Sequence, residues 1–275
     1  MNICFIGGGN MAIALIGGLI DTGFPAAQIS VVEIDAANRE RLKSTYGKII
    51  VFAEQGQQTI AKGDVVVLAV KPQQMEAVAV QLGPLLSGQI VLSIAAGIRL
   101  TDLASWLLVP TSNYRLVRAM PNTPALVGSA VTGLYSFPML AEQQRENVER
   151  IIGAVGSFVW IRSEEDMDAV TAISGSGPAY FFYFIEALEQ AGKELGLPEQ
   201  TARKLALETA FGAAKLARQS TEDPATLRAR VTSKNGTTER ALLSMEANHV
   251  KQHIITAAKA AAARSREMGD ELGKA

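Results

Sequence analysis

The stretch Ile3-Cys4-Phe5-Ile6-Gly7-Gly8-Gly9-Asn10-Met11-Ala12 decides the fold. A short apolar run leads directly into three glycines, and a helical period follows them. The glycines fit the pattern G-x-G-x-x-A, in which Gly7 permits a tight turn, Gly9 lets the backbone approach a pyrophosphate and Ala12 allows close helix–strand packing. Glycine triplets also mark ordinary loops, but the position between a strand and a helix favours a dinucleotide site whose phosphates meet the helix N-terminus.

Apolar strands and helical stretches alternate along the first part of the chain. The expected strands are Ile3–Ile6, Ile29–Ile34, Val65–Val70, Ile90–Ile94 and Leu116–Arg118. The expected helices between them are Met11–Ile20, Ala36–Tyr46, Gln73–Leu82 and Leu100–Leu107. Continuous apolar strands are typical of a parallel sheet that is covered on both faces. We therefore predict an α/β fold whose residues 1–160 form a Rossmann-type, doubly wound, dinucleotide-binding domain.

The character of the chain changes after about Trp160, where long alanine-rich helical stretches replace the strands. The expected helices are Gly177–Leu195, Pro198–Gln219, Pro224–Val231, Thr238–Ala247 and His249–Leu272. We expect residues 161–275 to form an all-helical substrate and dimerisation domain. The run Tyr180–Ile185 is apolar around its whole circumference, which predicts a helix buried on every side. Faces this broad, with the small residues of 257–263, indicate burial against a second subunit.

The composition excludes several classes of protein. The 275 residues carry a formal net charge of −1, with 48% hydrophobic and 19% charged residues, which argues against disorder and against a nucleic-acid partner. No apolar stretch is long enough to span a membrane, and no basic leader precedes the first strand. The single cysteine, Cys4, cannot form an internal disulfide and fits a reducing compartment. We expect a cytoplasmic protein with a small-molecule substrate.

Glu33 follows the second expected strand, about where a dinucleotide fold places an acid against the ribose hydroxyls. The alternative is a solvated carboxylate in a strand-to-helix turn. Arg39 and Arg41 follow closely and could instead receive a 2′-phosphate. The sequence leaves open whether the cofactor is NADH or NADPH, although Glu33 favours use of NADH at least as well as NADPH.

Two further strand ends complete the expected crevice. Val70-Lys71-Pro72 closes the strand that begins at Val65, at the carboxyl edge where open α/β sheets bind ligands. Ala95-Ala96-Gly97 ends the next strand in small residues, which would leave room for a flat nicotinamide ring. Either segment alone could be a plain strand end, but together with the glycine loop they outline one site.

Three segments resist a purely structural explanation. Arg118 to Pro124 combines two prolines with polar residues at a strand end, and Ser174 to Tyr180 opens a helix with small residues and a proline. Val231 to Thr238 places hydroxyls and a glycine turn just before another helix. Backbone amides at such a helix start can bind a carboxylate.

With these motifs in this order and spacing, the sequence resembles the Δ1-pyrroline-5-carboxylate reductases essentially from end to end. That family reduces a cyclic imine to L-proline with NADH or NADPH, the last step of proline synthesis. The resemblance implies an N-terminal Rossmann domain, a C-terminal helical domain that forms a homodimer, and often a ring of dimers. It implies cofactor contacts at Ile6, Gly7, Gly8, Gly9, Asn10, Met11, Val70, Lys71, Pro72, Ala95, Ala96 and Gly97.

The resemblance also implies substrate contacts at Glu164, Thr237 and Thr238, to which we add Ser176 and Gly236, with Thr238 as the catalytic group. One departure affects the substrate loop. The family usually has Ser-Pro-Gly-Gly-Thr-Thr, whereas this chain has Lys234-Asn235 in the second and third positions. Asparagine tolerates a left-handed backbone, so we expect the turn to persist, with Lys234 adding a charge beside the expected carboxylate site.

A strong proton donor is missing where a ketone reductase would need one. Related 3-hydroxyacid dehydrogenases carry a lysine shortly after a Gly-Ser-Gly helix start, and Phe181 stands at that position. A cyclic imine is basic enough to arrive protonated, so the enzyme mainly has to orient it and exclude water. The rival hypotheses are a reductase of another small imine or ketoacid on the same scaffold, and a non-catalytic dinucleotide-binding regulator.

Two other sites are not favoured. His249 and His253, four residues apart, could bind a metal with Glu246, but a solvated or interface helix face explains them better, and we expect no metal. Ser176 is not the nucleophile of a hydrolase, because Ser174 breaks the G-x-S-x-G pattern.

Overall fold

The computed structural model describes residues 1–110 and 113–273, and these fold into two compact units. The first comprises Met1–Ser176 together with Ala261–Ala275, and the second comprises Gly177–Ala260. Packing thus divides the chain after Ser176 and returns its last segment to the first unit. The domain boundary expected at residue 160 remains a prediction.

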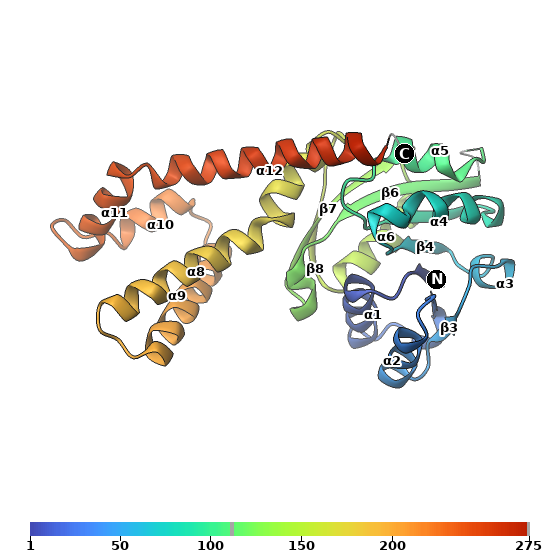
Figure 1. The fold of residues 1–275 in the computed structure, drawn as a ribbon, viewed down its shortest axis with the longest axis horizontal. Coiled ribbons are helices and arrows are strands. Elements are labelled where there is room, and N and C mark those ends of the chain that lie inside the picture. The colour runs from blue at the N-terminus through green and yellow to red at the C-terminus, as the bar shows by residue number, and fades with distance from the viewer. Residues whose placement is uncertain (111–112, 274–275) are drawn as a thin grey trace. The chain divides into compact units, whose positions relative to one another are not determined.

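The first unit is built on an eight-stranded sheet with the order β3-β2-β1-β4-β5-β6-β7-β8 (Figure 1). Its strands are β1 Ile3–Ile6, β2 Ile29–Val32, β3 Ile50–Phe52, β4 Val65–Leu68, β5 Gln89–Ser93, β6 Tyr114–Met120, β7 Ala130–Phe137 and β8 Gly156–Trp160. Neighbouring strands are parallel, except that β7 runs antiparallel to β6. The predicted α/β, doubly wound architecture is confirmed.

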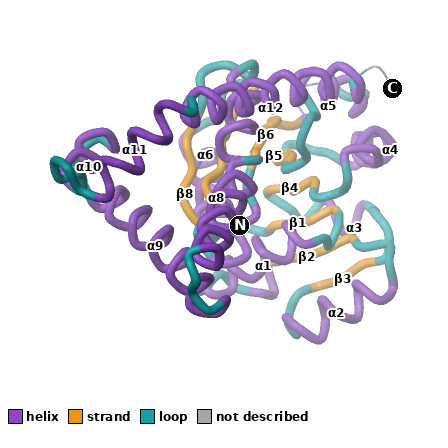
Figure 2. The backbone as a smooth tube through the Cα atoms, turned by 60° about the vertical axis from the view of Figure 1, so that its left-hand side comes forward, coloured by secondary structure: helices purple, strands orange, loops and turns teal. Residues whose placement is uncertain are grey.

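Helices cover both faces of this sheet (Figure 2). They are α1 Asn10–Asp21, α2 Ala36–Tyr46, α3 Gln57–Ile60, α4 Met75–Leu82, α5 Leu100–Leu107, α6 Glu142–Gly153 and α7 Asp166–Val170. Alternate side chains of β1 enter two separate cores: Ile3 and Phe5 pack with α1 and α6, whereas Cys4 and Ile6 pack with α4 and α5. This two-sided burial explains why β1 is continuously apolar in sequence.

Three strands and three helices of the first unit were not expected from the sequence: β3, β7, β8, α3, α6 and α7. β3 and α3 are very short, at three and four residues. β7 contains Gly133, where a Cβ would lie 2.5 Å from the Val170 side chain, so the glycine is there for packing and weakens the strand pattern. α6 has few apolar residues, and only Val148, Ile151 and Ile152 are buried.

The second unit is helical, as predicted. It contains α8 Gly177–Glu194, α9 Glu199–Gln219, α10 Pro224–Arg230 and α11 Thr237–Ala247, and the first part of α12 Val250–Leu272. Figure 1 shows α8 and α9 side by side, and they meet where Gly192 lies against Ala202. Among the described residues, no helix is both long and apolar enough to cross a membrane.

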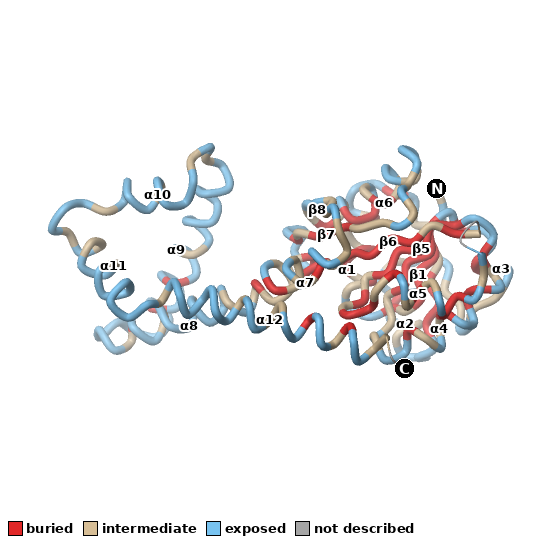
Figure 3. Tube along the Cα trace, turned by 90° about the horizontal axis from the view of Figure 1, so that it is seen from above, coloured by how far each residue is buried: buried red, intermediate tan, exposed pale blue. Residues whose placement is uncertain are grey.

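The expectation that α8 is buried on every side is wrong for a single chain. Phe181, Phe182 and Tyr183 are 69%, 66% and 76% exposed, and only Gly177 and Gly192 of this helix are buried. Figure 3 shows the contrast: burial is concentrated in the strands of the first unit, whereas α8 to α11 are largely exposed. The chain alone offers these aromatic side chains too little partner surface.

Candidate active site

The glycine loop closes at the carboxyl end of β1 in the conformation that its pattern requires. Gly7 has φ +97°, and a Cβ there would lie 2.7 Å from the Ala69 carbonyl oxygen. A Cβ on Gly8 would lie 2.7 Å from the Leu42 side chain, whereas one on Gly9 would meet nothing within 4 Å. The loop is therefore closed against the protein at Gly7 and Gly8 and open at Gly9, where a ligand can approach.

The first helix starts directly after this loop. Gly9 is its N-cap, and no side chain of the described residues caps it. The first amides of α1 are consequently available, and together with the helix dipole they suit a phosphate group.

A crevice of about 650 Å³ runs along the carboxyl ends of β1, β2, β3 and β4. The strand register explains how it is assembled, because Ile6 pairs with both Val32 and Leu68, so the segments that follow these strands leave the sheet at one edge. The expected cofactor residues that line it are Ile6, Gly7, Gly8, Gly9, Glu33, Val70 and Lys71. It is also lined by Asp35, Asn38, Glu54, Gln55, Gln73 and Gln74, which no local sequence pattern marked.

Other expected cofactor residues do not line this crevice: Asn10, Met11, Pro72, Ala95, Ala96 and Gly97. Gly97 is buried with φ +77°, and a Cβ there would lie 3.0 Å from Leu272 and 3.7 Å from Met268. Because Gly97 has no side chain, the end of α12 can pack against it within the first unit. The expected cofactor contacts of this set remain predictions.

The Glu33 carboxylate is held at the edge of the crevice by two backbone amides. The Gly8 N–H donates to Oε2 over 2.9 Å, and the Asp35 N–H donates to Oε1 over 2.8 Å. The side chain is only 8% exposed, so the alternative of a solvated carboxylate in a turn is wrong. Each carboxylate oxygen keeps a free lone pair that can accept a further hydrogen bond.

Arg39 does not reach the crevice. Its Nη1 donates to the carbonyl oxygens of Glu33 and Ile34 over 2.9 and 2.7 Å, which ties the guanidinium to the β2–α2 turn. Arg41 is exposed on α2 and also lies outside the crevice lining. Of the described residues that form this lining, Lys71 is the only basic one.

The residues present fit a dinucleotide. Gly9 leaves open space beside a free helix N-terminus, and Glu33 is fixed as an acceptor. The Gln55 Oε1 atom is buried and has no hydrogen-bond partner in the described chain, so an acceptor is left over at the β3 side of the crevice. An unpaired buried acceptor is costly unless a ligand satisfies it.

Glu164, expected to contact substrate, is engaged inside the first unit. Its Oε1 accepts a hydrogen bond from Arg118 Nη1 at 3.0 Å and one from the Leu100 N–H at 2.8 Å. The ion pair with Arg118 is largely buried, and the contact with Leu100 satisfies an amide at the start of α5. The substrate contact of Glu164 remains a prediction.

The segments Arg118–Pro124 and Ser174–Ser176 are brought together. The Asn122 side chain donates from Nδ2 to the Ser174 carbonyl over 3.0 Å and accepts at Oδ1 from the Val131 N–H over 3.1 Å. A Cβ on Gly175 would lie 2.6 Å from the Met120 Cε atom. Residues Thr171–Gly175 form a π-helical turn, a distortion often found at functional sites.

The substrate loop is described within the second unit. Gly236 is the N-cap of α11, so Thr237 and Thr238 are its first two residues and the alternative that Thr238 is an N-cap is wrong. Asn235 has φ +60°, which confirms that asparagine keeps the left-handed turn, and its N–H donates to Glu239 Oε2 over 2.7 Å. Gly236 packs against Ser233, where a Cβ would clash with the hydroxyl.

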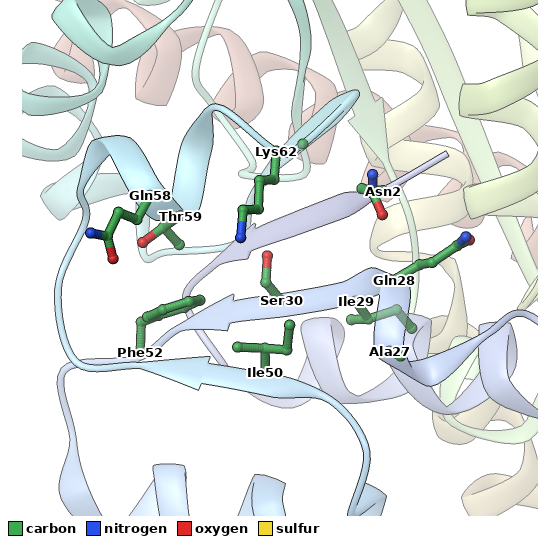
Figure 4. A pocket seen from close by; sticks show the side chains of 11 residues that line it. Asn2, Ala27, Gln28, Ile29, Ser30, Ile50, Phe52, Gln58, Thr59 and Lys62 are labelled. Atoms are coloured by element: carbon green, nitrogen blue, oxygen red, sulfur yellow. The ribbon is translucent and has the colours of Figure 1, made fainter.

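A second, smaller pocket lies at the opposite edge of the sheet (Figure 4). It has about 230 Å³ and lies at the amino ends of β1 and β2, where Asn2, Ser30 and Lys62 line it. Open α/β sheets bind ligands at the carboxyl ends of their strands, so this pocket is not the candidate active site. No group of three or more potential metal ligands occurs among the described residues.

Comparisons with known proteins match both parts of the chain. A family model described as pyrroline-5-carboxylate reductase dimerisation matches residues 164–268, and one described as NADP oxidoreductase coenzyme F420-dependent matches residues 2–97. The pyrroline-5-carboxylate reductase of Pseudomonas aeruginosa is 46% identical over 99% of this chain and 98% of its own length. That of Haemophilus influenzae is 43% identical over 97% of each chain.

Solved structures agree with these matches. A pyrroline-5-carboxylate reductase from Coxiella burnetii superposes with a TM-score of 0.90 at 38% identity, covering 97% of this chain and 98% of that one. The Plasmodium falciparum pyrroline carboxylate reductase with NADP bound gives a TM-score of 0.84 at 29% identity, covering 98% of each. With identities of this level over nearly the whole length, the chain belongs to the pyrroline-5-carboxylate reductase family.

Proposed function

We propose that the chain catalyses the NAD(P)H-dependent reduction of Δ1-pyrroline-5-carboxylate to L-proline, the last step of proline biosynthesis. The observation that carries the proposal is the crevice with its open glycine loop, in a chain that is 46% identical to a pyrroline-5-carboxylate reductase from end to end. Gly7 to Gly9 and Lys71 would hold the dinucleotide, which when bound supplies the hydride that reduces the carbon of the C=N bond.

The enzyme needs no strong acid for this reaction, because a cyclic imine arrives with its nitrogen already protonated. Phe181 at the position of the lysine in related ketone-forming dehydrogenases fits this chemistry. The amides at the start of α11 are suited to the substrate carboxylate, and the Thr238 hydroxyl to a hydrogen bond with the imine nitrogen. Ser176 and Glu164 are further substrate contacts in this proposal.

The test is the absorbance of the reduced nicotinamide after addition of pyrroline-5-carboxylate. We expect the cofactor to be oxidised with this substrate but not with pyruvate, and no reduction of oxidised cofactor with 3-hydroxyisobutyrate. Turnover of another imine or ketoacid alone would favour the first rival. Dinucleotide binding without any turnover would favour a regulator.

We further propose that the active form is a homodimer, with rings of dimers as a larger assembly. The match of residues 164–268 to a dimerisation family and the exposed aromatic side chains of α8 support the dimer. The single, buried Cys4 supports a reducing, cytoplasmic location.

A further inference from the structure

We infer that the crevice selects NADH over NADPH, because its ribose end offers hydrogen-bond acceptors and negative charges where a 2′-phosphate needs a cation. The inference rests on the proposed use of a nicotinamide dinucleotide. In dinucleotide folds, the residue that follows β2 faces the adenosine ribose. Glu33 occupies this position, so the selection depends on its surroundings.

Glu33 cannot turn away to admit a phosphate without losing both of its hydrogen bonds. The amides of Gly8 and Asp35 hold one carboxylate oxygen each, and the side chain is almost completely buried. A ribose hydroxyl can donate to the remaining lone pairs of this carboxylate, whereas a phosphate offers only acceptors and negative charge. The position therefore attracts a 2′-hydroxyl and repels a 2′-phosphate.

The neighbouring lining residues reinforce this selection. Asp35 and Glu54 add two more carboxylates to the crevice, and the buried Gln55 Oε1 is an acceptor without a partner in the described chain. The residue directly after Glu33 is Ile34, which is 77% exposed and apolar. None of these four side chains offers a positive charge to a phosphate.

The nearby arginines do not compensate. Arg39 and Arg41 both lie outside the crevice lining, and Arg39 Nη1 donates to the carbonyls of Glu33 and Ile34. Lys71 follows β4, which lies on the other side of β1 from β2 in the sheet. The only basic residue among the described lining residues is thus separated from Glu33 by the glycine loop.

Direct binding tests this inference without any imine substrate. Calorimetric titration of the full-length protein with NADH and NADPH should give a dissociation constant at least about tenfold higher for NADPH. The pair ADP-ribose and 2′-phospho-ADP-ribose should show the same preference, because the selection lies at the ribose. Equal or tighter binding of NADPH would overturn the inference.

Three variants locate the determinant. Ile34→Arg, at an exposed position that does not endanger folding, should lower the dissociation constant of NADPH at least about fivefold and leave that of NADH within twofold. Glu33→Gln should reduce the ratio between the two constants. The matched control Arg41→Gln should change neither, and a selective loss of NADPH binding in this variant would assign the phosphate to Arg41 and refute the inference.

Binding and turnover separate this inference from the proposed function. NADH preference without oxidation by pyrroline-5-carboxylate would refute the proposed function alone. Turnover with equal affinity for both cofactors would refute the selection alone. Failure of both dinucleotides to bind would refute both.

Discussion

Thr238 is the residue on which the proposed substrate contact depends most. It occupies the second position of α11, and Gly236 rather than Thr238 is the N-cap. Loss of its hydroxyl therefore removes no cap, and Thr238→Ala should leave the melting temperature nearly unchanged. A hydrogen bond that strengthens as the imine nitrogen becomes an amine should instead appear in kcat/KM.

We predict that Thr238→Ala lowers kcat/KM for pyrroline-5-carboxylate at least about tenfold, equivalent to ~1.4 kcal/mol of transition-state stabilisation. Thr238→Ser keeps the hydroxyl and should keep most of the activity. Cofactor affinity should barely change in either variant. Normal turnover combined with a lower melting temperature in Thr238→Ala would place the imine nitrogen elsewhere.

The carboxylate of Glu164 has a structural task that can be separated from a substrate contact. Glu164→Ala leaves the buried Arg118 guanidinium without its anion, and we predict that the free energy of unfolding falls by about 3 kcal/mol. Denaturant unfolding measures this loss. The control Glu40→Ala breaks the exposed ion pair with Lys43 and should cost less than about 0.5 kcal/mol.

Steady-state kinetics of Glu164→Gln then tests the substrate contact itself. The amide keeps an acceptor for the Leu100 N–H but loses the charge. If Glu164 also binds substrate, KM for the imine should rise while KM for the cofactor stays constant. A fall in stability without a change in KM for the imine would show that Glu164 has a structural role only.

The thiol of Cys4 is a residue whose reactivity follows from burial. Desolvation raises the pKa of Cys4 to about 11, and a side-chain hydrogen bond with Ser30 opposes this only in part. At pH 8 a thiol reagent should therefore label Cys4 much more slowly in the native protein than in the unfolded protein. In the unfolded protein the single cysteine should react at once. Rapid labelling of the native protein would show that β1 opens.

Among the elements, the π-helical turn Thr171–Gly175 depends on Asn122, a side chain that precedes β7 in the chain. Asn122→Ala removes the donor to the Ser174 carbonyl and the acceptor of the Val131 N–H. We predict a loss of about 2 kcal/mol in the free energy of unfolding. Asn122→Asp, which keeps the acceptor for Val131 but not the donor, should retain part of the stability; a fully stable Asn122→Ala would contradict this assignment.

The elements also show what the sequence could predict. The strands β1 and β4 are continuous apolar runs, and β2 and β5 are mostly apolar, because both faces are buried. α2 has the expected bounds because Asp35 caps it through the Asn38 N–H. β7 could not be predicted, since its pairing with β6 is a long-range, antiparallel contact. Its Gly133 is also required for packing, because a side chain there would clash with Val170. The local sequence pattern of a strand does not reveal such long-range partners.

The same limit applies to the candidate site. The glycine loop, Glu33 and Lys71 carry local patterns and were predicted, and they line the crevice. Glu54 and Gln55 were missed because they follow a strand of only three residues and enter the crevice through the sheet order. At Gly97, a small residue fits a ligand and a packed helix equally well in sequence, and only the structure reveals the contact with Leu272 and Met268.

At the scale of the whole molecule, the exposed aromatic side chains of α8 require a partner. Phe181, Phe182 and Tyr183 are each more than 60% exposed, and Phe211 on α9 is 64% exposed. Burial of one such side chain contributes roughly 1.5–3 kcal/mol, so several together can support a stable interface. Clustered apolar surface of this kind is typical of a protein–protein contact.

We predict that light scattering at micromolar concentration shows a dimer, or a multiple of it, and no monomer. Phe182→Glu places a charge in the contact and should produce monomers or aggregates, because an unpaired buried charge is costly. The control Lys48→Glu, at an exposed position after α2, should leave the mass unchanged. Activity should fall together with the dimer fraction in Phe182→Glu. A monomer that is stable and fully active would show that the exposed aromatic side chains of α8 have another purpose.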